Sequence, residues 1–212
     1  MEVCSFTVGP VQENCYLVRR DGSDRAVLID PGDEPGRLLN EIKRLGTSLD
    51  AILVTHTHFD HVGAVAPVAR QTGAEVWVPE IERGVLADIN SFVPFPEVGP
   101  FEGYEADHTL AGGERLELAG LEIEVLFTPG HSPGHVTFSL PGERAIFSGD
   151  VLFQRSVGRV DFPGGDWETL LASIASLVET LPPETVVYPG HMGVTTLGDE
   201  QASNPFLAEL AG

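Results

Sequence analysis

Apolar residues recur along the chain at two spacings, one typical of β-strands and the other of amphipathic helices. Short apolar runs bounded by polar or turn-forming residues predict strands. The predicted strands are Ala26–Asp30, Ala51–Thr55, Glu75–Val78, Leu121–Thr128, Val136–Leu140, Ala145–Ser148 and Thr185–Tyr188. Because several β-runs follow one another directly between residues 114 and 148, the pattern predicts a mixed α/β fold and not a simple βαβ repeat.

Three segments between these strands have the apolar spacing of helices. In 36–46 the leucines and the isoleucine fall on one face, and Gly46 follows as a C-terminal stop. The segment 166–181 repeats this spacing, with Asp166 placed as its N-cap. A third helix is predicted over 62–72, where alanine and valine predominate. The first two helices are each apolar on one face, so we expect them to pack on a sheet.

The segment Ile89–Tyr104 has no sustained period and predicts a long loop. It contains three phenylalanines and three prolines, at positions 92, 95, 101 and 94, 96, 100. Long loops in compact domains are often functional. Three interpretations therefore stay open: a connection packed on its own side chains, a lid that faces the substrate, and an interface between copies of the protein.

Acidic residues far outnumber basic ones, and the formal net charge is −20. Nucleic acid or an anionic membrane would have to approach a strongly negative surface, so we expect neither as a partner. A single site can still bind an anion locally. The composition leaves the oligomeric state open.

The length of 212 residues is enough for one domain, which we expect to span 1–212. No apolar run approaches the roughly 20 residues that cross a bilayer, and the first residues do not resemble a signal peptide. We therefore expect a cytoplasmic protein. Cys4 and Cys15 are too few for a disulfide framework, so they are expected to be buried free thiols.

Four of the predicted strands deliver histidine or aspartate at their carboxyl ends. These residues are His56, His58, Asp60 and His61 after the second strand, His131 after the fourth, Asp150 after the sixth and His191 after the seventh. Loops at one edge of a rigid sheet are where open α/β folds place ligands. Imidazole and carboxylate groups together bind zinc, iron or manganese. The pattern predicts a metal site, whereas His108 lies outside it and is interpreted as an ordinary surface histidine.

The string from His56 to His61, His-x-His-x-Asp-His, is the most specific signal in the chain. His56 and His58 can place both rings on one side of the backbone, while Asp60 and His61 can face a second centre. Four such side chains in six residues are hard to explain by packing, because each would need its own buried hydrogen-bond partner.

This string, followed by a histidine, an aspartate and a final histidine after later strands, resembles the metallo-β-lactamase superfamily over essentially the whole chain. The resemblance implies an αββα sandwich with two central sheets, flanking helices and a binuclear metal site. It further implies one metal held by His56, His58 and His131, and a second held by Asp60, His61 and His191, with Asp150 bridging them. Zinc is the first expectation, with iron and manganese as alternatives.

Narrower strings resemble the glyoxalase II branch of that superfamily. They are Thr128-Pro-Gly-His-Ser-Pro-Gly-His135, Phe147-Ser-Gly-Asp-Val-Leu-Phe153, Gly158-Arg-Val-Asp-Phe-Pro-Gly-Gly165 and the stretch from Pro189 to Glu200 with Asn204-Pro-Phe206. They imply a thioester hydrolase acting on a 2-hydroxyacyl thioester of glutathione or a related thiol through a hydroxide shared by two metals. Asp60 and Asp150 would be its catalytic carboxylates.

Two departures from the long glyoxalase II enzymes limit this resemblance. We expect no separate C-terminal helical domain for glutathione, because only about 20 residues follow His191. The segment after His191 also lacks the tyrosine of the long enzymes and has Met192 and Gly193 instead. Binding of the glutathione moiety therefore does not carry over.

Rival interpretations concern both the reaction and two further residues. Gly158-Arg-Val-Asp-Phe also resembles persulfide dioxygenases, which would use a single iron held by His56 or His58 with His131 and Asp150. Another metallohydrolase, such as a lactonase, is a further alternative. His135 is interpreted as a support for the metal site rather than a ligand. Arg159 either binds a substrate carboxylate or is anchored to a neighbouring aspartate.

Overall fold

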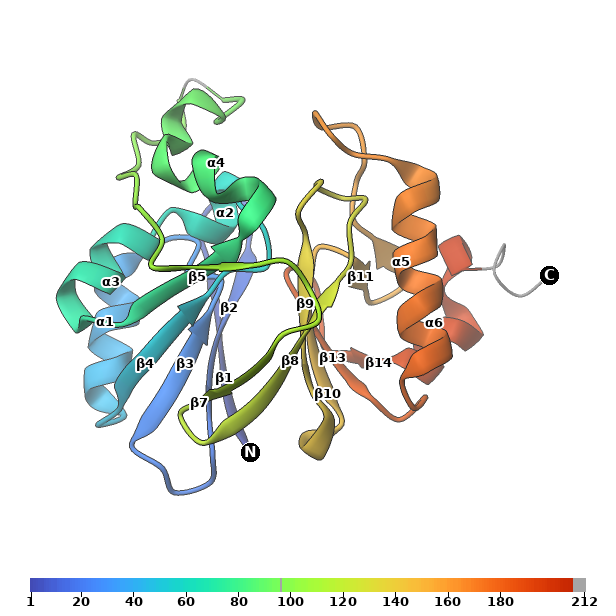
Figure 1. The fold of residues 1–212 in the computed structure, drawn as a ribbon, viewed down its shortest axis with the longest axis horizontal. Coiled ribbons are helices and arrows are strands. Elements are labelled where there is room, and N and C mark those ends of the chain that lie inside the picture. The colour runs from blue at the N-terminus through green and yellow to red at the C-terminus, as the bar shows by residue number, and fades with distance from the viewer. Residues whose placement is uncertain (96, 208–212) are drawn as a thin grey trace. The chain divides into compact units, whose positions relative to one another are not determined.

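The computed structural model describes residues 1–95 and 97–207, drawn in Figure 1. The strands are β1 Glu2–Val8, β2 Glu13–Arg19, β3 Arg25–Ile29, β4 Ser48–Leu53, β5 Glu75–Pro79, β6 His108–Leu110, β7 Arg115–Leu118, β8 Leu121–Phe127, β9 Val136–Leu140, β10 Ala145–Gly149, β11 Leu152–Phe153, β12 Ser156–Val157, β13 Val186–Pro189 and β14 Thr195–Thr196. The α-helices are α1 Pro35–Arg44, α2 Phe59–Val62, α3 Val65–Thr72, α4 Arg83–Ala87, α5 Trp167–Thr180 and α6 Leu197–Ser203. Short 3-10 helices cover Glu80–Glu82, Ile89–Ser91 and Pro141–Glu143.

The chain divides into two compact units, each of which is described by itself. The first contains Met1–Leu110 and Leu116–Glu122, and the second contains Ala111–Arg115 and the chain from Ile123 onward. Whether 1–212 acts as a single domain stays a prediction. None of the described helices is long and apolar enough to cross a membrane.

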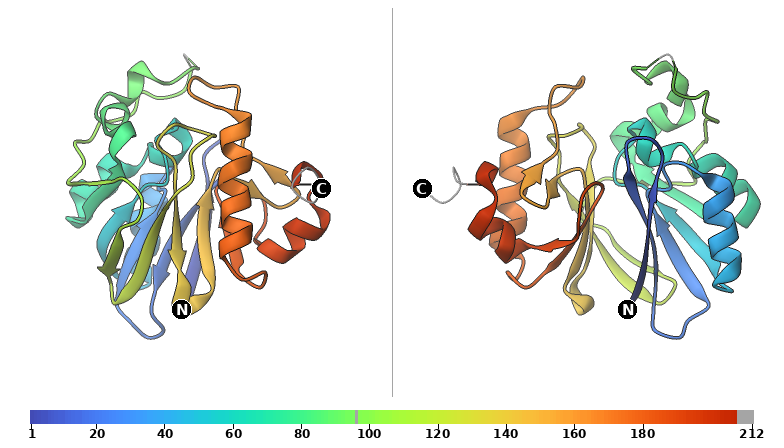
Figure 2. Two further views of the ribbon diagram at one scale, coloured as in Figure 1. Left: turned by 45° about the vertical axis from the view of Figure 1, so that its right-hand side comes forward. Right: turned by 180° about the vertical axis from the view of Figure 1, so that it is seen from behind.

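The first unit is built on a sheet with the strand order β1-β2-β3-β4-β5-β6. Strands β1 to β3 pair antiparallel, and β3 to β6 pair parallel. Helices α1 and α3 lie together over one face of this sheet (Figures 1 and 2). The parallel strands therefore end at one edge, where the loops after β3 and β4 carry polar side chains.

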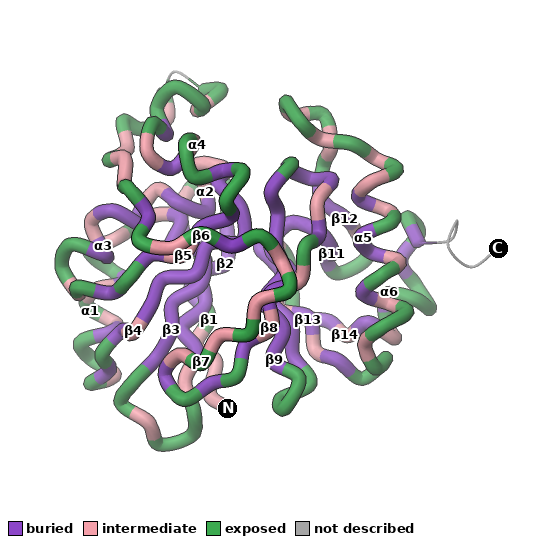
Figure 3. The backbone as a smooth tube through the Cα atoms, in the orientation of Figure 1, coloured by how far each residue is buried: buried purple, intermediate pink, exposed green. Residues whose placement is uncertain are grey.

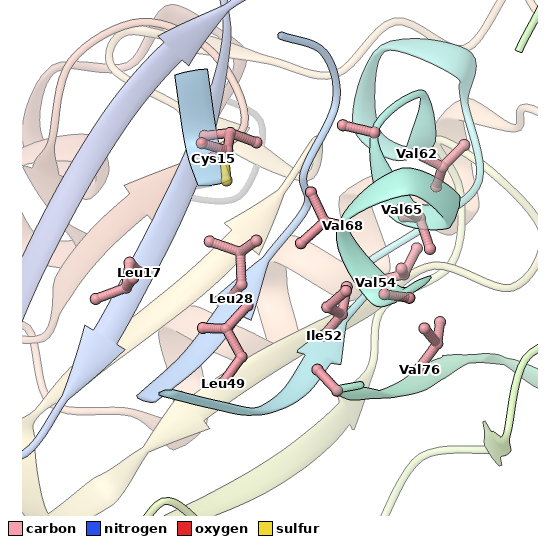
Figure 4. Close-up of a cluster of buried hydrophobic side chains, with 14 of the residues drawn as sticks. Cys15, Leu17, Leu28, Leu49, Ile52, Val54, Val62, Val65, Val68 and Val76 are labelled. Atoms are coloured by element: carbon pink, nitrogen blue, oxygen red, sulfur yellow. The ribbon is translucent and has the colours of Figure 1, made fainter. Parts of the chain in front are cut away.

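The core of the first unit is formed where this sheet meets its helices. Leu28 and Ile52 on neighbouring strands and Val65 and Val68 on α3 are fully buried in one cluster (Figure 4). Cys15 belongs to this core, and its burial raises the pKa of its thiol. Both cysteines are free, as predicted, although Cys4 is only half-buried. This packed core fixes the strand ends that precede the predicted metal ligands.

The second unit contains most of a sheet with the order β14-β13-β10-β9-β8-β7. Strands β10 and β13 pair parallel, while β8, β9 and β10 form an antiparallel meander. Helix α5 buries Leu170, Ile174 and Leu177 in a cluster with Ile146 and Val187 of this sheet. Every residue of β9 and β10 is buried. Figure 3 colours the buried parts of the chain purple. The buried second sheet thus fixes the carboxyl end of β10, which Asp150 directly follows.

Two mixed sheets with helices confirm the predicted α/β class. The predicted strands are all present with ends shifted by a few residues, and the helix predicted over 166–181 is α5, with Asp166 accepting a hydrogen bond from the Thr169 backbone N–H as its N-cap. The helix predicted over 62–72 is wrong at its start. The chain forms α2 and α3 separately, because the Ala64 N–H donates to the Pro31 carbonyl outside the helix.

The segment 89–104 is largely irregular after its first 3-10 turn, as predicted. Phe92 and Phe95 are 58% and 40% exposed, whereas Phe101 packs partly buried against the core of the first unit. Pro96, one of its three prolines, lies outside the described residues. The segment is therefore not uniformly exposed, because one of its three phenylalanines is anchored.

Candidate metal centre

In the first unit, the four predicted ligands follow β4 in a short loop that runs into α2. His56 and His61 are fully buried, and His58 is the residue before α2. The backbone here is held close to the turn after β3, since a Cβ built on Gly32 would lie 1.6 Å from the Asp60 carbonyl oxygen. Only glycine at position 32 permits this approach. The loop is thus pressed against the sheet edge, and its side chains are gathered in one place.

The ring of His56 has its orientation set by Thr55 and Asp30. The Thr55 hydroxyl lies 2.6 Å from Asp30 Oδ2 and 3.0 Å from His56 Nδ1. A hydroxyl has one proton, which goes to the carboxylate, so its oxygen accepts the proton of His56 Nδ1. This network assigns the proton of the neutral ring to Nδ1 and leaves a lone pair on Nε2.

The lone pair of His56 Nε2 faces the ring of its neighbour in the motif. His56 Nε2 lies 3.1 Å from His58 Nδ1. Two nitrogens bound to one tetrahedral zinc ion at about 2.0–2.1 Å would be roughly 3.3 Å apart. The first two histidines of the motif therefore present ring nitrogens at a separation that one metal ion can bridge.

Asp30 also determines the orientation of His61. His61 Nδ1 donates to Asp30 Oδ2 at 3.1 Å, and the side chain of Glu13 is fully buried with its Oε1 3.8 Å from the same nitrogen. His61 Nε2 points to the other side, where Asp60 Oδ2 is 3.9 Å away. Asp30, His56 and His61 have candidate ligand atoms within 4.8 Å of one another. A carboxylate behind a metal-binding histidine fixes its tautomer and raises its basicity, and this arrangement fits such a role.

A second buried carboxylate holds the backbone of the histidine loop. Glu82 Oε2 accepts hydrogen bonds from the Thr57 backbone N–H at 2.7 Å and from the Thr57 hydroxyl at 2.9 Å. Glu82 is 4% exposed. Because Thr57 lies between His56 and His58, these two bonds restrict the spacing of the two rings.

In the second unit, the three remaining predicted ligands lie together in the loops that follow β8, β10 and β13. His131 Nε2 is 3.5 Å and His191 Nε2 is 3.6 Å from the same oxygen, Asp150 Oδ2. His131 Nδ1 donates to the Arg159 carbonyl at 2.7 Å, so its Nε2 carries the lone pair. Two imidazoles that converge on one carboxylate oxygen are compatible with a carboxylate that bridges two metal ions.

The ring of His135 supports this second group by binding the backbone of Asp150. The Asp150 backbone N–H donates to His135 Nε2 at 3.1 Å, and His135 Nδ1 lies 3.1 Å from the Thr128 hydroxyl. Both ring nitrogens are thereby used within the second unit, which fits a supporting role for His135. Position 158 next to Asp150 requires glycine, because a Cβ there would lie 1.9 Å from the Asp150 carbonyl oxygen.

Arg159 pairs with the neighbouring aspartate, which was one of the two predicted alternatives. Its Nε and Nη2 donate to the two carboxylate oxygens of Asp161 at 2.5 and 2.6 Å. The hydrogen bond from the guanidinium lowers the pKa of Asp161 to about 2. The guanidinium carbon also lies 4.2 Å from the centre of the Phe162 ring. Arg159 is thus occupied by its own loop.

His108 lies outside both groups of ligands. It is on β6, where its Nε2 is 3.0 Å from Glu75 Oε2 and its ring stacks on Trp77 at 4.0 Å. In contrast, Asp30 and Glu82 contact the histidine loop and were not predicted. Asp30 directly follows an apolar strand, as the predicted ligands do, so the same rule applied to the first strand would have found it. Glu82 follows no such pattern in the sequence.

Comparison with known proteins gives a consistent match along the chain. The Metallo-beta-lactamase superfamily matches residues 8–191. A relative from Haemophilus influenzae, named hydroxyacylglutathione hydrolase GloC, is 37% identical over 98% of this chain and 98% of its own length. Among solved structures, BLEG-1 B3 metallo-beta-lactamase has a TM-score of 0.92 at 39% identity and covers 98% of this chain and 100% of that one. TTHA1623 in a di-iron-bound form has a TM-score of 0.79 at 44% identity, covering 97% and 100%.

Proposed function

Because the chain belongs to the metallo-β-lactamase superfamily, we propose that it is a hydrolase dependent on two divalent metal ions. The proposed ligands are His56, His58 and His131 for one ion, Asp60, His61 and His191 for the other, and Asp150 for both. Zinc is the proposed metal, and the di-iron form of the relative TTHA1623 makes iron the first alternative, followed by manganese.

One observation carries this proposal. Each of three proposed ligand histidines, His56, His61 and His131, has its Nδ1 bonded to an oxygen of the protein and its Nε2 directed elsewhere. Metal-binding histidines almost always use their second nitrogen in this way. His135, interpreted as a support and not as a ligand, differs because its Nε2 accepts a hydrogen bond from the Asp150 backbone N–H.

The protein residues would then orient the reaction. Bound divalent ions lower the pKa of water toward about 7 and polarise a carbonyl oxygen. Thr55, Asp30 and the Arg159 carbonyl accept the Nδ1 protons of His56, His61 and His131, so that Nε2 of each ring carries the lone pair that would bind metal. Glu82 fixes the loop that carries His56 and His58. The carboxylates of Asp60 and Asp150 are the proposed catalytic groups that hold and orient the attacking water.

We propose a thioester as the substrate. A thiolate whose thiol has a pKa near 8.5 leaves without much help from a general acid. The relative named hydroxyacylglutathione hydrolase supports a 2-hydroxyacyl thioester of glutathione or a related thiol. We place this reaction in the cytoplasm, where such small-molecule thiols occur.

The proposal is tested by metal analysis combined with three activity assays. Protein purified with metal present should contain close to two metal ions per chain and should release thiol from S-lactoylglutathione. His58→Ala should lower both metal content and thiol release, whereas His108→Ala, on β6 and outside both groups, should lower neither. Equal effects of the two substitutions would contradict the assignment.

The rival activities give different results in the same experiment. A persulfide dioxygenase would hold a single iron and consume oxygen with glutathione persulfide. A lactonase would hydrolyse a lactone and leave the thioester intact. Either result would replace the thioester proposal.

A further inference from the structure

The first unit contains a pocket of about 530 Å³ beside the proposed metal ligands. Its walls are the turn after β1, the turn after β3, helix α2 and the segment 97–102. Asp60 forms part of the wall. Since Asp60 is a proposed metal ligand, a molecule held in this pocket would reach the proposed reaction centre.

One side of the pocket is apolar, and hydrogen bonds with Asn90 hold part of it in position. Phe59 and Phe101 line it and stack with their ring centres 6.2 Å apart. Asn90 fixes Phe101 at both backbone groups, because its Oδ1 accepts from the Phe101 N–H at 2.9 Å and its Nδ2 donates to the Phe101 carbonyl at 2.7 Å. Gly63 lies directly beneath, where a Cβ would be 2.6 Å from the Phe101 ring. This wall is therefore preformed.

The charged side chains that line the pocket are all acidic. Asp33 and Glu97 lie in its walls together with Asp60 and Glu102, and none of the described lining residues is lysine or arginine. Glu102 has its own partner in Arg70. The nearby guanidinium of Arg37 is bonded to Glu34 and to a backbone carbonyl. The carboxylates of Asp33 and Glu97 are thus the charges that a guest in the pocket would meet.

We propose that this pocket receives an apolar substituent of the substrate that is uncharged or cationic, and that Asp33 and Glu97 exclude an anionic one. The proposal rests on the hydrolase function and names the part of the substrate that selectivity acts on. Phe59 and Phe101 supply contact with the apolar group, and they also provide ring faces over which a cation is attracted. A carboxylate or sulfonate in the same place would be repelled by two nearby negative charges.

The test uses lactoyl thioesters that differ only in the head group of the thiol. Thiocholine carries a trimethylammonium group, neohexanethiol carries its uncharged carbon analogue, and mercaptoethanesulfonate carries an anion of similar size. A second series places the same three head groups on the acyl side. In at least one series we expect kcat/KM of the metal-loaded protein to be highest for the cationic or neutral compound and lowest for the anionic one.

Substitutions then connect this order to the pocket. Asp33→Asn keeps the acceptor for the Glu34 backbone N–H, which Asp33 Oδ1 binds, and Glu97→Gln changes an exposed side chain. Each should raise kcat/KM for the anionic thioester about threefold to tenfold relative to kcat/KM of the same variant for the neutral thioester. Glu97→Lys should raise kcat/KM for the anionic thioester further and lower kcat/KM for the cationic thioester. Glu117→Gln, exposed on β7 and outside the pocket lining, is the matched control and should change none of them.

Failure of this inference differs from failure of the hydrolase proposal. If all thioesters are hydrolysed but the substitutions act equally on anionic and neutral compounds, or only as the control does, the pocket does not select by charge. A preference for the anionic compound in both series would also overturn the inference. If no thioester is hydrolysed by protein that contains its metals, the hydrolase proposal is the one that fails.

Discussion

Replacing Asp30 by asparagine tests whether the carboxylate behind the histidines prepares them for metal. Asp30 accepts three hydrogen bonds, from the Thr55 N–H at 2.7 Å, the Thr55 hydroxyl at 2.6 Å and His61 Nδ1 at 3.1 Å. Asparagine has the same shape and also tolerates the left-handed backbone of this position, where φ is 48°. Its amide supplies one acceptor oxygen and an NH2 group that only donates.

The magnitude follows from these contacts. With the amide oxygen on the Thr55 N–H, the NH2 group meets the proton on His61 Nδ1. Either that buried donor loses its acceptor, which costs about 1–3 kcal/mol, or the proton moves to Nε2 and removes the lone pair. Substitutions of such supporting groups lower metal affinity about 10- to 100-fold. This corresponds to about 1.4–2.7 kcal/mol of binding free energy for the ion held by His61.

The assay is competition for metal between the metal-free protein and a chromogenic chelator. Asp24→Asn is the matched control, because it removes the same charge from an exposed side chain of the first unit. Circular dichroism of each metal-free variant establishes that it is folded. A folded Asp30→Asn protein that binds both metal ions with the wild-type affinity, within about twofold, would refute the role assigned to Asp30.

Three further predictions concern the second unit and the segment after α4. Asp150→Ala should abolish most thiol release, since both His131 and His191 converge on its carboxylate, and turnover comparable to wild type would remove it from the proposed centre. Arg159→Ala should raise the pKa of Asp161 from about 2 toward its ordinary value. NMR titration of the Asp161 carboxyl carbon measures this pKa in both proteins. Because the pKa is lowered in the folded wild type, the stabilising effect of the pair is present above the ordinary aspartate pKa and is lost as the pH falls toward about 2. Replacing 92–101 by a short Gly-Ser connection should raise KM with little change in metal content or Tm if the segment is a lid. Dissociation of an oligomer with preserved kinetics would show that the segment is an interface. No change in kinetics or in oligomeric state would show that it is a plain connection.

The sequence predicted the elements whose signals are local. Periodicity located α5, and the apolar runs located the strands that the predicted ligands follow. It did not reveal β2, because its first residues, Glu13 and Asn14, are polar and nevertheless buried. Burial of a polar residue depends on what the folded chain places beside it, which no hydropathy pattern contains.

The candidate site shows the same division. The ligand types and their spacing stand out in the sequence, whereas the residues that orient them depend on contacts between distant segments. Asp30 bonds to residues 25 and 31 positions away, and Glu82 to one 25 positions away. Asp30 was interpreted as the last residue of a strand, but in the structure it follows β3 with a left-handed backbone and points to the loop after β4.

The pair of hydrogen bonds between Asn90 and the backbone of Phe101 has a consequence for how this protein can diversify. It closes the intervening stretch at its base, so insertions or deletions inside that stretch need not disturb the strands on either side. The proposed metal ligands come from other parts of the chain. A relative that keeps this pair of hydrogen bonds can therefore differ in the residues between them, Glu97 of the pocket lining included, without any change in the residues proposed to bind metal.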